Sequence, residues 1–126
     1  MEVVHDRQMN ANEPAFMPPV DIIEGPSAYR LLLMLPGMEA DHVELELQGR
    51  LLLVRGERRR PAMEHGEKLL VEESRHGFFA RQFRLPETVE AGAVKARYEG
   101  GVLEITIPKQ TPAPARRITV TGKDSS

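Results

Sequence analysis

The side chains of this sequence that could do chemistry are four histidines and several neighbouring carboxylates. The histidines show none of the spacings typical of metal ligands, such as H-E-x-x-H. Glu44 and Glu46 could be read as an acid–base pair, but their strand-like alternation predicts a solvated face instead of a cleft. No glycine-rich phosphate loop of the form G-x-x-x-x-G-K-[ST] occurs. We therefore expect no catalytic residue, no cofactor and no metal site, and the protein is not expected to be an enzyme. The histidines are His5, His42, His65 and His76.

Composition narrows the class of partner. The chain has 126 residues and a formal net charge of −2, so it has no overall basic field to attract nucleic acid or an anionic membrane. It contains no cysteine, which fits a reducing compartment. The longest apolar run, 31–36, is far shorter than a membrane span, and the first residues show no apolar signal region. We expect a cytoplasmic protein that binds neither nucleic acid nor membrane.

Alternating apolar residues between prolines and glycines predict several short strands. Val43, Leu45 and Leu47 face one way in the segment 42–48, and glutamates and a glutamine face the other. Gly100 and Gly101 separate two such runs, which is typical of a hairpin. The pattern predicts one all-β domain over 18–109, an antiparallel β-sandwich, with a short flexible arm of 1–17 before it and a flexible extension of 110–126 after it. The expected strands are 20–24, 28–35, 42–48, 51–55 ended by Gly56, 77–85, 94–98 and 102–107, with a short helical turn near 87–91.

The segment 57–76 is longer than a compact sandwich needs, and such insertions are usually functional or disordered. Its polar sequence contains Leu69, Leu70 and Val71 in succession. Three exposed aliphatic residues would favour aggregation, so we expect them to be covered as a short strand. The cover could come from a second subunit, which would make the segment a dimerisation device, or from the chain's own domain. The pattern does not decide between the two.

The extension carries a second apolar pair beyond the proline-containing spacer 111–115. Ile118 and Val120 are two residues apart, so in an extended chain both project to the same side and could fill adjacent pockets on a sheet edge. The alternative is a frayed or self-docked last strand.

Several ordered segments of the chain resemble the small heat shock protein family. The run from Phe79 to Pro86, FARQFRLP, resembles the family's F-x-R-x-F-x-L-P, and ARYEGGVL, from Ala96 to Leu103, resembles its A-x-x-x-x-G-V-L signature. The likeness covers roughly residues 18–120. It is to the bacterial and plant type of the family.

The resemblance implies an immunoglobulin-like sandwich, the α-crystallin domain, and two interfaces between subunits. The loop strand at 69–72 would pair with the partner's strand at 21–24, and the I-x-V motif of the extension would dock in a groove between 43–47 and 94–98 of a neighbouring dimer. The implied dimer-interface residues are Leu69, Leu70, Val71, Glu72, Asp21, Ile22 and Ile23. The implied groove residues are Val43, Leu45, Leu47, Val94 and Ala96, and the docking residues are Ile118 and Val120.

The function that the resemblance implies is an ATP-independent holdase, a chaperone that binds partly unfolded proteins and prevents their aggregation. The expected partners are therefore other copies of the chain, in a homodimer or larger assembly, and unfolded client proteins. The arm is shorter than is usual in the family. Its sizeable apolar residues are the candidates for client binding: Val3, Val4, Met9, Phe16 and Met17. The alternatives are a p23-like co-chaperone and a structural assembly subunit that binds no clients.

Overall fold

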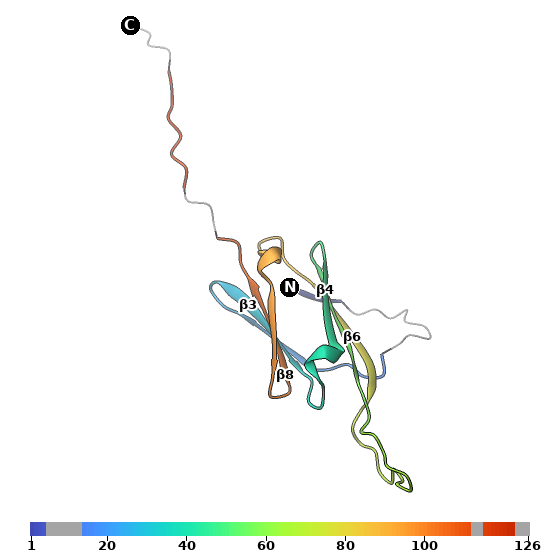
Figure 1. Ribbon diagram of the computed structural model, residues 1–126. Helices are drawn as coiled ribbons and strands as arrows, with labels where there is room; N and C mark the ends of the chain where they lie inside the picture. Colours follow the sequence, from blue (N-terminus) through green and yellow to red (C-terminus); the bar gives the residue numbers. More distant parts are fainter. Residues whose placement is uncertain (5–13, 112–114, 123–126) are drawn as a thin grey trace.

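The protein is an all-β sandwich of two four-stranded antiparallel sheets (Figure 1). The computed structural model describes residues 1–4, 14–111 and 115–122. One sheet has the order β2-β3-β8-β7 and the other has the order β1-β6-β5-β4. The expected antiparallel sandwich is thus confirmed. The strands are β1 (Glu2–Val4), β2 (Val20–Glu24), β3 (Ala28–Met34), β4 (Val43–Gln48), β5 (Leu51–Arg58), β6 (Gly77–Arg84), β7 (Lys95–Glu99) and β8 (Val102–Pro108), with short 3₁₀ turns η1 (Ala40–His42) and η2 (Ala91–Ala93).

The core lies between the two sheets and follows the alternation of the strands. Every second residue of β8 is buried, and β3 and β6 repeat the pattern. The core is mainly aliphatic, with two fully buried phenylalanines on β6. The fully buried side chains include Leu31, Leu33, Phe79, Phe83, Ile105 and Ile107.

Proline and glycine set most strand ends, but Gly56 does not end a strand. The bounds of β2 are those expected, because prolines precede the strand and Gly25 follows it. The expected end of the next hairpin at Gly56 is wrong, since β5 continues to Arg58. A Cβ at Gly56 would lie 2.5 Å from the carbonyl oxygen of His42 and 2.8 Å from Cε1 of Phe79. This glycine permits close packing within the sheet and does not stop it.

Three short elements begin later than expected. Strand β7 starts at Lys95 instead of residue 94. His42 belongs to η1, so β4 starts at Val43. The helical turn expected near 87–91 is η2, at Ala91–Ala93. The one-residue shifts of β4 and β7 are of the size by which element boundaries vary, whereas the helical turn begins four residues later than expected.

The N-terminal residues are part of the sandwich, which differs from the flexible arm expected over 1–17. Strand β1 pairs with the outer edge of β6, with Val3 opposite Phe83. Further along, the backbone N–H of Ala15 donates to the carbonyl oxygen of Phe78 at 2.8 Å, and Phe16 is only 7% exposed. The arm covers a strand edge that would otherwise leave backbone groups unpaired.

The structure also bears on membrane insertion. Within residues 1–4, 14–111 and 115–122, no helix is long and apolar enough to cross a membrane.

Candidate interaction surfaces

The long loop between β5 and β6 projects away from the sandwich (Figure 1). Its apolar residues Leu69, Leu70 and Val71 are 53%, 87% and 72% exposed. They form no strand in this single chain, unlike the strand expected there. These residues also do not pack against their own domain, which was the alternative expected for the loop. Their cover, if they have one, must come from another molecule.

The two sides of this loop are joined near its base by polar contacts. Arg60 Nε donates a hydrogen bond of 2.8 Å to Glu72 Oε1, and His76 Nδ1 lies 3.3 Å from the same oxygen. A guanidinium nitrogen of Arg58 donates to the carbonyl oxygen of Arg75 at 3.1 Å. The hydrogen bond from Arg60 lowers the pKa of Glu72, against a smaller opposing effect of desolvation. Glu72, expected at the dimer interface, is here bound within its own loop.

Strand β2 forms an open edge of its sheet. Its only strand neighbour within the described part of the chain is β3. Ile22 and Ile23 are 37% and 39% exposed, and Asp21 is exposed as well. An edge strand of this kind can accept a further strand through its free backbone groups.

A groove lies between β4 and β7, at the other edge of the sandwich. Leu45 and Leu47 line it from β4, Val94 and Ala96 line it from the opposite sheet, and Leu52 also contributes. Its volume is about 340 Å³. Four of the five expected groove residues thus lie together. The fifth, Val43, packs against the core at the start of β4 and does not line the groove.

The C-terminal extension leaves the sandwich after an anchored base. Lys109 and Gln110 donate backbone hydrogen bonds to the carbonyl oxygens of Ser27 and Thr88, at 2.8 and 2.7 Å. Lys109 Nζ also contacts Glu24 Oε2 at 2.7 Å. This hydrogen bond, with the charge of Lys109, lowers the pKa of Glu24.

Beyond this base, residues 115–122 extend away from the sandwich (Figure 1). Ile118 and Val120 are 79% and 89% exposed, and the described part of the extension contains no strand. The self-docked last strand is therefore not formed in this chain. The two side chains are available to another molecule.

The expected client-binding residues are divided by the structure. Val3 and Val4 are half-buried in β1, and Met17 is 49% exposed. Met9 lies outside the described residues. Phe16 belongs to the core, where its ring lies 5.4 Å from that of Phe79, and this corrects the expectation that it is an exposed client-binding group.

Two arginines, Arg58 and Arg81, hold the arm in place. The Arg58 guanidinium lies 4.5 Å from the centre of the Phe16 ring. Arg81 is 8% exposed and donates a hydrogen bond of 2.7 Å to the carbonyl oxygen of Pro18, while burial lowers its pKa. The position of Arg81 in the sequence could have indicated this contact. It alternates with Phe79 and Phe83 on the inward face of β6, and a buried charge needs a hydrogen-bonding partner.

These surfaces define an all-β domain that leaves an open strand edge, an apolar loop and an apolar tail for other protein chains. The chain matches the Hsp20/alpha crystallin family over residues 21–121, and it belongs to that family. The expected family is thereby confirmed. Small heat shock proteins are ATP-independent chaperones and not enzymes, so a chaperone role in general follows.

Individual relatives agree with this assignment. Small heat shock protein C2 of Rickettsia felis is 31% identical over 113 residues, which cover 90% of this chain and 73% of that protein. The chloroplastic heat shock 22 kDa protein of Chlamydomonas reinhardtii is 42% identical over 110 residues, covering 82% and 69%. The solved structure of a small heat-shock protein from Xylella fastidiosa superposes with a TM-score of 0.76 at 34% identity, covering 86% of this chain and 99% of that one. The chain thus spans about two thirds to three quarters of the length of these two curated relatives.

Proposed function

We propose that this protein is a holdase, which binds partly unfolded proteins by burying apolar surface and keeps them from aggregating without using ATP. The observation that carries the proposal is the exposure of large aliphatic side chains on the loop and the tail, outside a complete core. Exposed apolar groups gathered in this way mark surfaces for other proteins. Their burial is favourable without any chemical step. Because the chain has no cysteine, we further propose that it acts in the reducing cytoplasm.

The first partner in this proposal is a second copy of the chain. The loop segment 69–72 would add to the open edge of β2, next to Ile22 and Ile23. Support comes from the exposure of both surfaces and from the absence of any cover for Leu70 within the described residues. Glu72 would have to exchange its contact with Arg60 for one across the dimer, or keep it while the backbone pairs. Replacing Leu70 with Asp is expected to produce monomers, whereas Met63→Asp, in the same exposed loop, keeps dimers. Sedimentation-velocity ultracentrifugation separates the two species, and dimers of both variants would exclude this interface.

The second partner is a neighbouring dimer, reached through the tail. Ile118 and Val120 would occupy the apolar groove lined by Leu45, Leu47 and Val94. Burial of two such side chains contributes roughly 3–6 kcal/mol before ordering costs, so one tail binds weakly and several tails reinforce one another.

Clients would bind the apolar groups that assembly leaves free. Met17 is exposed at the end of the arm, and flexible methionines suit contact with varied sequences. Val3, Val4 and Phe16 could contribute only if the arm separates from β6, because they are paired or buried in the structure.

The position of Phe16 favours a second candidate, a structural assembly subunit without client binding. An arm that is packed into its own domain has less apolar surface to offer than an arm that is free. Both candidates form homo-oligomers, and they differ only in client capture.

One experiment tests the proposal and separates the candidates. A heat-labile enzyme is heated with this protein at stoichiometric amounts and without nucleotide, while light scattering is recorded. The holdase predicts suppressed scattering, and an unrelated β-sandwich of similar size is the control for crowding. Undiminished scattering at an excess of assembled protein would reject the holdase and leave the structural subunit.

A further inference from the structure

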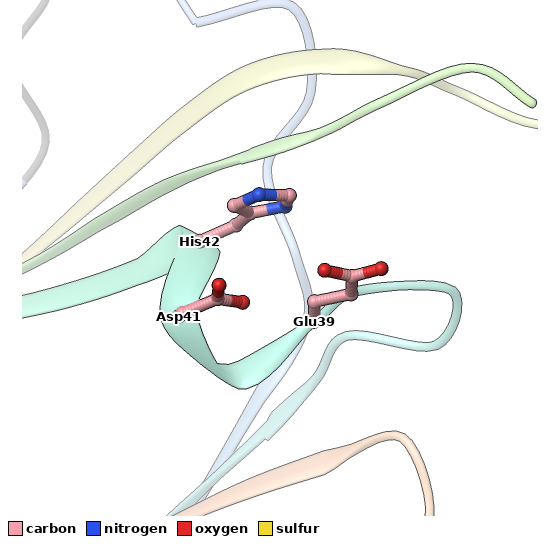
Figure 2. Close-up of side chains that lie close together, drawn as sticks. All are labelled: Glu39, Asp41 and His42. Atoms are coloured by element: carbon pink, nitrogen blue, oxygen red, sulfur yellow. The ribbon is translucent and has the colours of Figure 1, made fainter. Parts of the chain in front are cut away.

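Three potential ligand side chains meet at the turn that precedes β4. Glu39, Asp41 and His42 each offer one ligand atom, and these atoms lie within 4.8 Å of one another. Figure 2 shows the two carboxylates and the imidazole around one open space beside η1. Neither the sandwich nor the proposed chaperone interfaces use these side chains.

The backbone explains why they are close. The N–H of His42 donates to the carbonyl oxygen of Glu39 at 3.0 Å, which closes a single 3₁₀ turn. In such a turn, side chains three residues apart lie on the same side, so Glu39 and His42 face each other. The bare α-carbon of Gly56 lets the His42 carbonyl lie directly against β5, which holds the turn in place.

The charges of this cluster are not neutralised. None of the three side chains forms a hydrogen bond or an ion pair with any residue that the structure describes. Two glutamates on the adjoining strand differ in this respect, because Glu44 and Glu46 both contact Arg55, at 3.0 and 3.8 Å. Two free carboxylates beside an imidazole form a site suited to a cation.

A third carboxylate lines the hollows beside this cluster from a different element. Glu57, on β5, lines a hollow of about 450 Å³ together with Glu39 and His42. It also lines a second hollow, of about 460 Å³, together with Asp41 and His42. A bound ion could therefore be shared between η1 and β5.

The positive charges around the two hollows are mostly engaged elsewhere. Arg55 contacts glutamates of β4, and Arg60 is hydrogen-bonded to Glu72. Arg59 also lines the first hollow and is the opposing charge nearest to Glu57 in sequence. Its positive charge weakens the negative potential of the carboxylates, but Arg59 forms no ion pair with them among the described residues.

We propose that Glu39, Asp41 and His42, with Glu57 as a further ligand, bind a divalent transition metal of the zinc class. One imidazole with carboxylate oxygens is a donor set that zinc accepts, whereas calcium and magnesium prefer oxygen alone. Donors about 2.0–2.2 Å from the metal stand about 3.4 Å apart in a tetrahedral site, so ligand atoms that lie within 4.8 Å of one another need to close by at most about 1.4 Å. Asp41 and Glu39 are exposed and free to rotate that far. The ion would tie η1 to β5 at the start of the long loop.

Zinc ions titrated calorimetrically into the full chain test this site. We expect one ion per subunit, and His42→Ala should weaken binding at least about tenfold, since loss of even an outer-shell partner costs roughly 10–100-fold. His65→Ala is the matched control, because His65 is exposed in the loop, and it should leave the affinity unchanged. Glu39→Gln with Asp41→Asn is a second variant that keeps shape and should also weaken binding.

Three results would overturn the proposal. They are the absence of saturable zinc binding to the wild-type chain, equal zinc affinity of the wild-type and His42→Ala proteins, and calcium binding as tight as that of zinc. Circular dichroism confirms that each variant is folded before the titration. The outcome is independent of chaperone activity, because binding is measured without a client.

Discussion

The two ends of this chain both carry large apolar residues, but most of those described in the arm are buried or half-buried, and those of the tail are exposed. The arm places Phe16 in the core and pairs Glu2–Val4 with the edge of β6. The tail leaves Ile118 and Val120 in solvent, beyond an anchored base at Lys109. The arm packs on its own sandwich, whereas the tail is free to bind another molecule.

The difference teaches that apolar content alone does not decide where a segment binds. The surfaces that the arm contacts, the edge of β6 and the ring of Phe79, belong to the same chain. The tail is directed away from the sandwich (Figure 1), and we propose that its partner is another copy of the chain. The long loop resembles the tail, because its Leu70 is equally uncovered.

The largest effect is expected from the tail. Replacing Ile118 and Val120 with Ser removes the groups whose burial contributes roughly 3–6 kcal/mol before ordering costs. Size-exclusion chromatography with light scattering should show the assembly reduced to dimers, with the unfolding of the sandwich itself unchanged within about 0.5 kcal/mol. Thr119→Ser is the control and should keep the assembly. An assembly of unchanged size would remove the tail from the account.

The next effect is expected from the arm, and on stability rather than size. Phe16→Ala should lower the free energy of unfolding by about 3 kcal/mol, because it leaves a cavity beside Phe79 and removes the ring beneath Arg58. Met17→Ala, at a half-exposed position, should cost far less. Denaturant unfolding at one fixed protein concentration measures both, since subunit association also contributes. Equal values for the two variants would show that Phe16 is not held in the core.

A smaller effect is expected where β1 joins the sheet. Val3 packs against the core, so Val3→Ser should cost about 1 kcal/mol through the loss of partly buried apolar surface. Val4 is the neighbouring position of the same strand and is not among the residues packed on the core. Val4→Ser should therefore have less effect in the same unfolding experiment. The reverse order would contradict the orientation of β1.

The smallest effect concerns the anchored base of the tail and depends on pH. The contact with Lys109 lowers the pKa of Glu24 below its ordinary value of 4.5. A lowered carboxylate pKa contributes stability above the unfolded pKa, and this contribution is lost as the pH falls through the folded pKa. The difference in stability between the wild type and Lys109→Met should thus be present at neutral pH and be lost as the pH falls through the lowered pKa of Glu24. Lys95→Met, on β7, is the control, and a difference that persists in acid would assign the effect to the Lys109 side-chain contact with Tyr29.

The sandwich was largely predictable because local signals set it. Prolines and glycines bound β2 within the alternating pattern, and Gly100 with Gly101 forms the expected hairpin between β7 and β8. Gly56 is the exception, since a glycine that ends a strand and one that allows close packing look alike in sequence.

The contacts of the arm could not be predicted, because they join residues about 60–80 positions apart. Val3 meets Phe83, and Arg81 bonds the carbonyl of Pro18. The sequence of the arm contains no alternating pattern from which these partners could be predicted. The segment 69–71 forms no strand in the single chain, because its apolar side chains find no cover within the described residues.

The most direct test of the contrast between arm and tail is hydrogen exchange of the full chain, measured by mass spectrometry at two protein concentrations. The account predicts that peptides containing residues 2–4 and 15–17 are protected at both concentrations, because their partners are in the same chain. Peptides containing 116–121 should be protected only at the concentration at which the assembly forms. A tail protected in dilute dimers, or an arm that loses protection on dilution, would contradict the account.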